Sequence, residues 1–207
     1  MTDYKTDDEK VEELKAWWKE NGTSVIAGVA LAIAGLFGWE YWKDYKAATA
    51  AEASALYAKV ADAAEASPEQ AMADVQALQA GYASTPYAAT ASLKAAQQFA
   101  EKGEYDKAAT TLRWVVDNSK QEEYKLLASL RLARVLLASG KPEEAAKLTG
   151  QTYPAAYQSL LEELKGDIYT AQNKPAEARA AYDKAILGNT GGSVEFIKMK
   201  RDNLGEG

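Results

Sequence analysis

The pattern of hydrophobic and polar positions changes character at about residue 42. Between Asn21 and Trp39 the chain has nineteen consecutive residues without a charge. Beyond Trp42 the apolar residues recur at helical spacing, and short turn signals separate the amphipathic segments. The pattern therefore predicts an all-α chain, in which a single N-terminal transmembrane helix is followed by a water-exposed helical region.

The uncharged segment has the length of a membrane span. From Trp18 to Trp39 a helix rising ~1.5 Å per residue extends about 31 Å, close to the ~30 Å hydrocarbon core of a bilayer. Aromatic residues, which favour the membrane–water interface, lie at both ends of the span. We expect these aromatic residues to be interface anchors: Trp17, Trp18, Trp39, Tyr41 and Trp42.

Two other interpretations of this segment are a cleaved signal peptide and a buried core helix. The residues before the span carry a net charge of −3 (four lysines, seven carboxylates) rather than the positive charge of a leader. A core helix rarely has aromatic residues at both ends. The four lysines before the span, against Lys43 and Lys46 close behind it, favour a cytoplasmic N-terminus and an exported C-terminal region.

The chain thus divides into a cytosolic acidic arm (1–20), a transmembrane anchor (21–42) and a repeat domain (43–207). In the arm, Thr6 and Glu9 fit a capping box at the start of a short amphipathic helix, which we expect Asn21-Gly22 to end. The apolar face of this helix would contain Val11, Leu14 and Trp18.

Small residues share one face of the predicted span. Gly28, Ala32 and Gly35 follow one another at intervals of four and three residues, a spacing that allows a second helix to approach closely. The other interpretation is an anchor rich in alanine and glycine that faces lipid.

Similar turns recur in the C-terminal region. They begin at Gly103, Gly140 and Asn173, 37 and 33 residues apart, and each has an alanine five positions later. This period resembles the tetratricopeptide repeat, so the sequence predicts a tetratricopeptide-like α-solenoid of helix pairs. We also expect an earlier pair (46–66 and 68–80) and a C-terminal capping helix (193–204). An irregular alanine-rich bundle is the alternative.

The first helices of such units line a concave surface, where partner segments bind. By the repeat register, the groove would contain six residues with charges of both signs: Lys94, Gln97, Arg131, Arg134, Glu163 and Asp167. Equally, these side chains are solvated positions of an acidic domain. Five aromatic residues are either binding anchors or part of the core: Tyr82, Tyr87, Trp114, Tyr153 and Tyr157.

Composition restricts the chemistry. The 207 residues include 24 Lys and Arg, 30 Asp and Glu, no histidine and no cysteine, for a net charge of −6. Ser-His-Asp and Cys-His catalysis, disulfides and the usual zinc, copper and haem ligand sets are excluded. The acidic charge also argues against nucleic-acid binding. We expect no enzyme and no cofactor or metal, with carboxylate, lysine or hard-metal catalysis as the remaining enzymatic hypothesis.

The order of features resembles the YfgM family of ancillary SecYEG translocon subunits in Gram-negative bacteria. The resemblance rests on Asn21-Gly22, on the span ending Gly38-Trp39-Glu40-Tyr41-Trp42 and on the ending Met199-Lys200-Arg201-Asp202-Asn203-Leu204. It implies a single-pass inner-membrane protein with a periplasmic repeat domain. It also implies association with the translocon and with a membrane-anchored periplasmic chaperone of the PpiD type, and no catalytic residues.

Three hypotheses follow. The first is a non-catalytic scaffold in contact with membrane lipid that is associated with the SecYEG translocon and links exported proteins to periplasmic chaperones. The second is a membrane-anchored stress-response regulator acting through the cytosolic arm (1–20). The third is the enzyme without histidine or cysteine described above.

Overall fold

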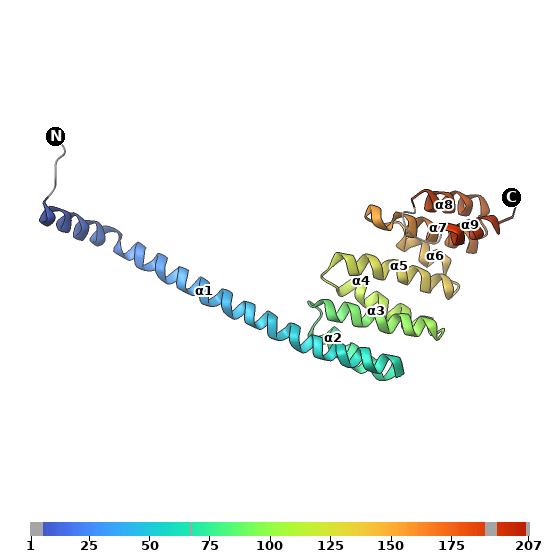
Figure 1. Cartoon of the computed structure of the whole chain (residues 1–207), viewed down its shortest axis with the longest axis horizontal. Coiled ribbons are helices and arrows are strands. Elements are labelled where there is room, and N and C mark those ends of the chain that lie inside the picture. Colours follow the sequence, from blue (N-terminus) through green and yellow to red (C-terminus); the bar gives the residue numbers. More distant parts are fainter. Residues whose placement is uncertain (1–5, 67, 189–193, 206–207) are drawn as a thin grey trace. The chain divides into compact units, whose positions relative to one another are not determined.

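The computed structural model describes residues 6–66, 68–188 and 194–205, in which every regular element is a helix, as predicted. The chain forms two compact units, Met1–Thr49 and Ala50–Gly207. Helix α1 (Asp7–Ala66) begins in the first unit and ends in the second (Figure 1). The other helices are α2 (Pro68–Gly81), α3 (Pro86–Glu101), α4 (Tyr105–Asn118), α5 (Glu122–Ala138), α6 (Pro142–Leu148), the 3-10 turn η1 (Ala155–Tyr157), α7 (Gln158–Ala171), α8 (Pro175–Leu187) and α9 (Val194–Asp202).

Helix α1 starts as predicted but does not end where predicted. The Thr6 amide donates to Glu9 Oε2 at 3.1 Å, as in a capping box. The expected end at Asn21-Gly22 is wrong, because both residues are accommodated inside the helix. The Asn21 amide group donates to the Trp17 carbonyl at 3.0 Å, and Gly22 lies against the Trp18 indole, 3.1 Å from where a Cβ would stand.

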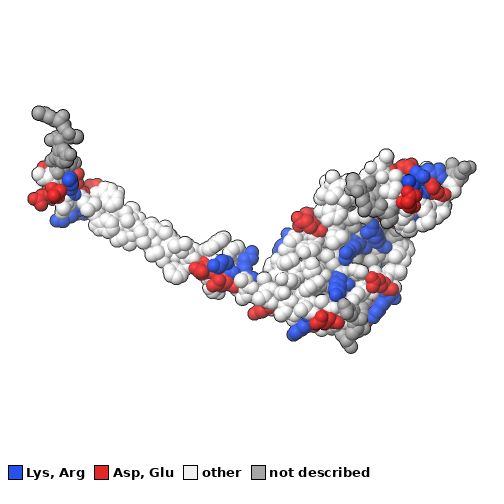
Figure 2. Space-filling view, in the orientation of Figure 1, with Lys and Arg blue, Asp and Glu red and all other residues white. Residues whose placement is uncertain are grey.

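The predicted span is exposed along its length. Leu31, Leu36 and Phe37 each have more than 70% of their surface accessible, which is unlike a core helix. Figure 2 shows an uncharged stretch in the first unit with charged residues at both ends. Among the described residues, α1 is the one helix long and apolar enough to cross a membrane, and it fits a single-pass membrane protein.

In the second unit, prolines mark helix starts. Helices α2, α3, α6 and α8 begin at Pro68, Pro86, Pro142 and Pro175. A proline in the first helical turn costs no hydrogen bond, because the amides there have no partner within the helix. Four of the five prolines of the chain therefore fix where helices of the repeat domain begin.

The three aligned turns have the same backbone structure. Gly103, Gly140 and Asn173 adopt φ values of +77°, +76° and +58°, and end α3, α5 and α7. After each of them the next amide donates to a carbonyl five residues back, at 2.8–2.9 Å, which is the Schellman pattern. The recurring turn predicted from the sequence is therefore a recurring helix end.

Successive helices pack in antiparallel pairs, and the first helices of the pairs also pack side by side, α3 on α5 and α5 on α7 (Figure 1). A large core containing Phe99, Leu112 and Leu164 runs from the end of α1 to α7. A smaller cluster joins Tyr182 of α8 to Ile197 of α9. The tetratricopeptide-like solenoid and its C-terminal capping helix are thus confirmed; Ser193, the expected first residue of that helix, lies outside the described residues.

The pair formed by α5 and α6 departs from the regular repeat. Helix α6 ends at Leu148, because the Thr149 hydroxyl and amide both bond to the Ala146 carbonyl. Tyr153 follows in an extended segment and is 4% exposed, with its hydroxyl donating to the Leu148 carbonyl at 3.0 Å. Tyr153 therefore joins the core from the segment that follows α6.

Candidate partner-binding groove

The groove is formed by the first helices of the pairs. Because α3, α5 and α7 pack side by side, residues at equivalent positions of these helices lie along one surface of the repeat domain. Gln97, Arg134 and Asp167 each stand six residues before the turn that ends their helix. The six predicted groove residues therefore come from three neighbouring helices. In the structure they fall into three groups with different contacts.

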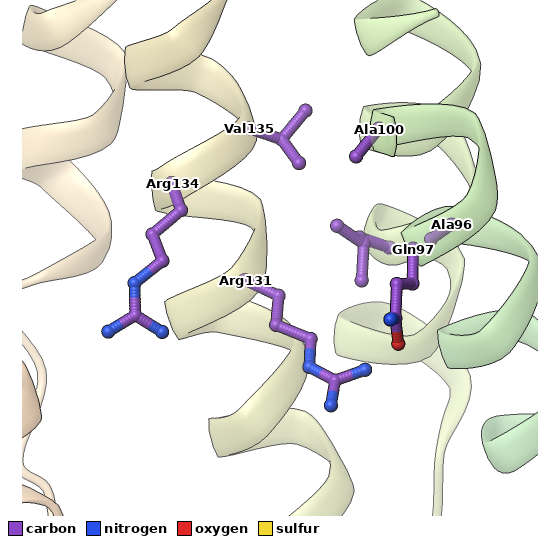
Figure 3. Close-up of a pocket in the computed structure, with 7 residues that line it drawn as sticks. Ala96, Gln97, Ala100, Arg131, Arg134 and Val135 are labelled. Carbon is purple, nitrogen blue, oxygen red and sulfur yellow. The ribbon is translucent and has the colours of Figure 1, made fainter. Parts of the chain in front are cut away.

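The central part of the groove is hollow and open. A cavity of about 340 Å³ lies between α3, α4 and α5, with an apolar lining that includes Leu112 and Val135. Gln97, Arg131 and Arg134 also line it. In Figure 3 the Arg131 side chain extends toward Gln97, whereas Arg134 extends away from it. Three of the six predicted groove residues are thus brought together at one cavity.

The two arginines of this cavity have no acidic partner in the part of the chain that the structure describes. Within residues 6–66, 68–188 and 194–205, no ion pair or side-chain hydrogen bond involves Arg131 or Arg134. Arg113 on α4, in contrast, pairs with Glu144 at 3.3 Å. Figure 2 shows basic side chains gathered over the middle of the repeat domain, whereas acidic and basic side chains are interleaved near its C-terminal end. The cavity therefore combines apolar walls with available positive charge.

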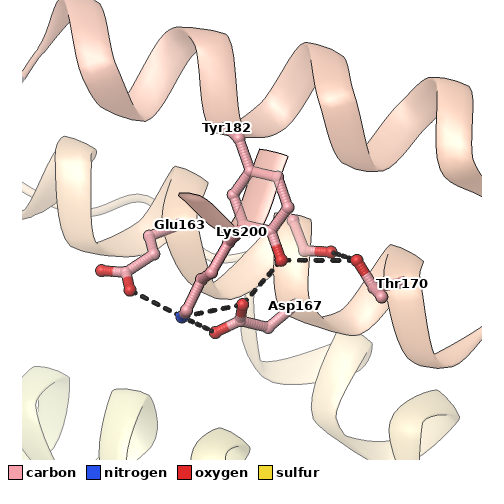
Figure 4. A network of polar contacts seen from close by, with 6 residues as sticks. Glu163, Asp167, Thr170, Tyr182 and Lys200 are labelled. Carbon is pink, nitrogen blue, oxygen red and sulfur yellow. Dashed lines mark hydrogen bonds and ion pairs between the residues drawn. The ribbon is translucent and has the colours of Figure 1, made fainter. Parts of the chain in front are cut away.

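The acidic end of the predicted groove is occupied by the capping helix. Lys200 of α9 donates to Glu163 at 2.8 Å and to both carboxylate oxygens of Asp167 at 2.9 Å (Figure 4). The Tyr182 hydroxyl donates to Asp167 at 2.7 Å and lies 3.3 Å from the Thr170 hydroxyl. Glu163 and Asp167 are therefore engaged in holding α9 on the solenoid.

This network shifts the pKa of its two donors. Burial lowers the pKa of Lys200, but its hydrogen bonds and ion pairs with Glu163 and Asp167 outweigh that effect, so the pKa is raised overall. Burial also raises the pKa of Tyr182 far above its usual value, and Asp167 adds to this shift. At neutral pH the network is therefore a protonated lysine and a protonated phenol around two carboxylates.

Lys94 lies at the other end of the predicted groove. Its ammonium group donates to the Ala61 carbonyl near the end of α1, at 3.3 Å. Lys94 thus contacts the helix that precedes the solenoid. The repeat register gave no sign of this contact between residues 33 positions apart.

The five aromatic candidates belong with the core. Tyr153 is buried, and the other four, Tyr82, Tyr87, Trp114 and Tyr157, are partly buried and pack against the core cluster. Tyr82 also donates to Glu52 of α1 at 2.9 Å, a hydrogen bond that raises its pKa. The structure therefore favours the core interpretation of these residues over the anchor interpretation.

In the first unit, the predicted membrane residues lie on open surfaces. Apart from the backbone of the same helix, no atom of the described residues would come within 4 Å of a Cβ at Gly28 or Gly35, so a second helix has room to approach this face. The centroids of the Trp39 and Trp42 rings lie 5.2 Å apart with the ring planes tilted by 36°, and the Lys46 ammonium lies 4.4 Å from the Trp42 ring centroid. The predicted interface anchors are all exposed: Trp17, Trp18, Trp39, Tyr41 and Trp42.

Metal binding has no assembled ligand set in the part of the chain that is described. No group of three or more Asp and Glu residues is placed to hold a metal ion there. The acidic residues of the predicted groove, Glu163 and Asp167, are bound to Lys200. What the groove offers chemically is shape, apolar surface and charge.

Comparison with known proteins agrees with the fold. Residues 15–206 match the family described as tetratricopeptide repeat-like domain. Three relatives, each named ancillary SecYEG translocon subunit, come from Haemophilus influenzae (27% identical over 198 residues, 96% of this chain and 97% of the relative), Escherichia coli (29% over 205, 99% of each) and Neisseria gonorrhoeae (32% over 208, 99% and 100%). No solved structure matches the chain. With the repeat-like family matched from residue 15 to residue 206 and relatives aligned nearly end to end, this chain belongs to the tetratricopeptide repeat-like proteins and, among them, to the YfgM family of ancillary SecYEG translocon subunits.

Proposed function

We propose that the protein is a non-catalytic, membrane-anchored interaction scaffold that associates with the SecYEG translocon and links exported proteins to periplasmic chaperones. The observation that carries this proposal is the groove cavity with two unneutralised arginines in a chain whose relatives are named translocon subunits. A repeat domain with an open groove presents a surface for partner segments. The names of the relatives and the repeat-like family also support an accessory, non-enzymatic role.

The proposed topology follows from the same features. The arm (1–20) is cytoplasmic, the anchor (21–42) crosses the inner membrane in contact with lipid, and the repeat domain (43–207) lies in the periplasm. In this arrangement the span reaches the translocon, and the groove meets a chaperone of the PpiD type and the emerging chain. Protease added to sealed spheroplasts should digest the repeat domain, and digestion only from the cytosolic side would refute this topology.

Photo-crosslinking tests the scaffold directly. A photoreactive residue at Ala32 in the span should capture translocon subunits, and one at Gln97 at the cavity should capture a membrane-anchored chaperone. A third position, Arg113 on α4, controls for non-specific capture because its side chain is paired with Glu144 outside the cavity. Recovery of neither component from Ala32 and Gln97 would overturn the proposal.

The regulator hypothesis is the second candidate, because the arm exposes apolar side chains. Val11, Leu14 and Trp18 are each about half exposed or more, as a helix face that binds a partner would be. Deleting residues 2–20 while keeping the anchor and the repeats distinguishes the two hypotheses. If this deletion, and not charge reversal at the cavity, removes the cellular phenotype, the arm and not the groove performs the function.

A further inference from the structure

One position of the repeat carries a different charge in each of the three helices α3, α5 and α7. The residue six positions before the helix-ending turn is neutral in α3 (Gln97), positive in α5 (Arg134) and negative in α7 (Asp167). Since the three helices pack side by side, the position recurs along one surface. Its side chain therefore faces whatever lies against that surface.

The α7 position shows how such a residue is used. Asp167 holds Lys200, which belongs to a helix of the same chain that packs on α8. A second carboxylate one turn earlier, Glu163, shares the same ammonium group. The chain thus contains one complete example of a charged side chain captured by two opposite charges at this register.

The α5 position also carries a pair of like charges on one helix, here of the opposite sign. Arg131 lies three residues before Arg134, whereas Glu163 lies four residues before Asp167. Neither arginine takes part in an ion pair among the described residues. A guanidinium group matches a carboxylate with two parallel hydrogen bonds, so this pair is suited to an acidic side chain. A basic side chain would be repelled there.

The walls of the cavity beside the arginines are apolar, so a bound segment would also need an apolar side chain. The walls include Ala96, Leu112 and Val135, and the cavity volume of about 340 Å³ is at the low end of the range for whole ligands, ~300–1,000 Å³. That size suits one or two large side chains of a longer segment. Shape and charge together therefore specify an apolar residue close to an acidic one.

We propose that this cavity binds an acidic segment of a partner protein, with a carboxylate on Arg131 and Arg134 and a neighbouring apolar side chain in the hollow. The inference rests on the scaffold function proposed above and names the chemistry of the segment that the scaffold recognises. Asp167 and Glu163 are a parallel case of opposite charge, since Lys200 binds both carboxylates in the same chain.

Selection from a random nonapeptide display library tests the proposal and does not require the partner to be identified. The full-length protein is held in phosphatidylcholine nanodiscs, and selection is run on wild type, on Arg131→Glu/Arg134→Glu and on the control Arg113→Glu. Wild type and the control should enrich Asp or Glu next to Leu, Ile or Phe, and the charge-reversed variant should enrich Lys or Arg instead. Gain of basic peptides also shows that the reversed variant is folded.

Individual peptides then give the size of the effect. Replacing the acidic residue of a selected peptide with its amide should weaken binding to wild type by about tenfold, as expected for a charge-assisted hydrogen bond, and weaken binding to Arg134→Gln much less. Absence of acidic enrichment on wild type, or the same enriched peptides on wild type and the reversed variant, would overturn the proposal. So would arginine-dependent binding to phosphatidylglycerol vesicles with no acidic peptide selected, which would identify a lipid headgroup as the ligand.

These outcomes are separable from the scaffold function. If crosslinking captures the translocon and a chaperone but the library shows no acidic preference, the scaffold function stands and the inferred ligand is wrong. If acidic peptides are selected through Arg131 and Arg134 but neither component is captured, the ligand chemistry stands and the proposed function fails.

Discussion

At Gly166 the structure predicts that adding a single methyl group strongly destabilises the repeat domain. Gly166 lies in α7 directly against the Tyr182 ring of α8, and a Cβ added there would stand 2.4 Å from the nearest ring carbon. Carbon atoms in contact are ordinarily 3.5–4.0 Å apart. The substitution Gly166→Ala therefore requires the ring or the helix to move by about 1 Å.

The Tyr182 ring cannot move by this distance without a cost in stability. Its side chain is 2% exposed, and its hydroxyl is fixed by Asp167 at 2.7 Å. Overpacking of this kind costs ~1–3 kcal/mol, and weakening a hydrogen bond to a carboxylate costs up to ~1.5–3 kcal/mol. Alanine recovers about 1 kcal/mol of helix propensity. The net expectation is a loss of about 2–4 kcal/mol in the free energy of unfolding of the repeat domain.

Thermal unfolding of the full chain in detergent, followed by circular dichroism at 222 nm, measures this loss. For a domain of this size we expect the midpoint to fall by about 5–15 °C. Gly81→Ala is the matched control, because that glycine also lies in a helix and a Cβ there would meet no atom within 4 Å. In a Tyr182→Leu background, Gly166→Ala should cost little. A midpoint at or above that of wild type, or an equal penalty in both backgrounds, would refute the steric argument.

Other substitutions test the turns, the capping helix and the irregular pair formed by α5 and α6. Lys200→Met should cost about 1–2 kcal/mol at pH 7. Because the pKa of Lys200 is raised in the folded state, its contribution is complete below the unfolded pKa of about 10.4 and is lost as pH rises through the folded pKa, so melting curves of variant and wild type should converge at strongly alkaline pH. Gly140→Ala should destabilise by about 1–2 kcal/mol, because its φ of +76° is unfavourable for alanine, whereas Asn173→Gly should stabilise by up to about 1 kcal/mol in urea unfolding. Tyr153→Phe should cost about 1 kcal/mol by the same assay through the hydrogen bond it loses to the Leu148 carbonyl.

Features of the fold that depend on nearby residues were predictable from the sequence. The turns at Gly103, Gly140 and Asn173 require a residue that tolerates positive φ, and glycine and asparagine are the residues that do. Prolines fixed the starts of four helices for an equally local reason. The end predicted for the arm helix at Asn21-Gly22 was wrong, although it used similar signals. There, Asn21 donates a hydrogen bond to the Trp17 carbonyl and Gly22 packs against Trp18, so the helix continues through both residues.

The contacts that Lys94, Glu163 and Asp167 make with distant parts of the chain were not predictable from the sequence. The repeat register assigned Glu163 and Asp167 to the predicted groove, but only the folded chain brings Lys200 to them from more than thirty residues away. In the sequence, Lys200 was noted only as one residue of the C-terminal motif that starts at Met199. A signal was nevertheless present, since a lysine on a predicted capping helix is a natural partner for two acidic residues at the end of a groove. The same reasoning finds no described partner for Arg131 and Arg134.

Net charge and local charge give opposite expectations for the partner of this protein. A net charge of −6 favours approach of basic molecules at long range, whereas the open cavity favours an acidic segment at contact. Salt shortens the range of the overall repulsion to ~8–10 Å but screens a partly enclosed ion pair less. Binding of an acidic peptide through the partly buried Arg131 should therefore lose less affinity with added salt than a surface ion pair does. That difference would locate the recognition in the cavity rather than in the overall field of the domain.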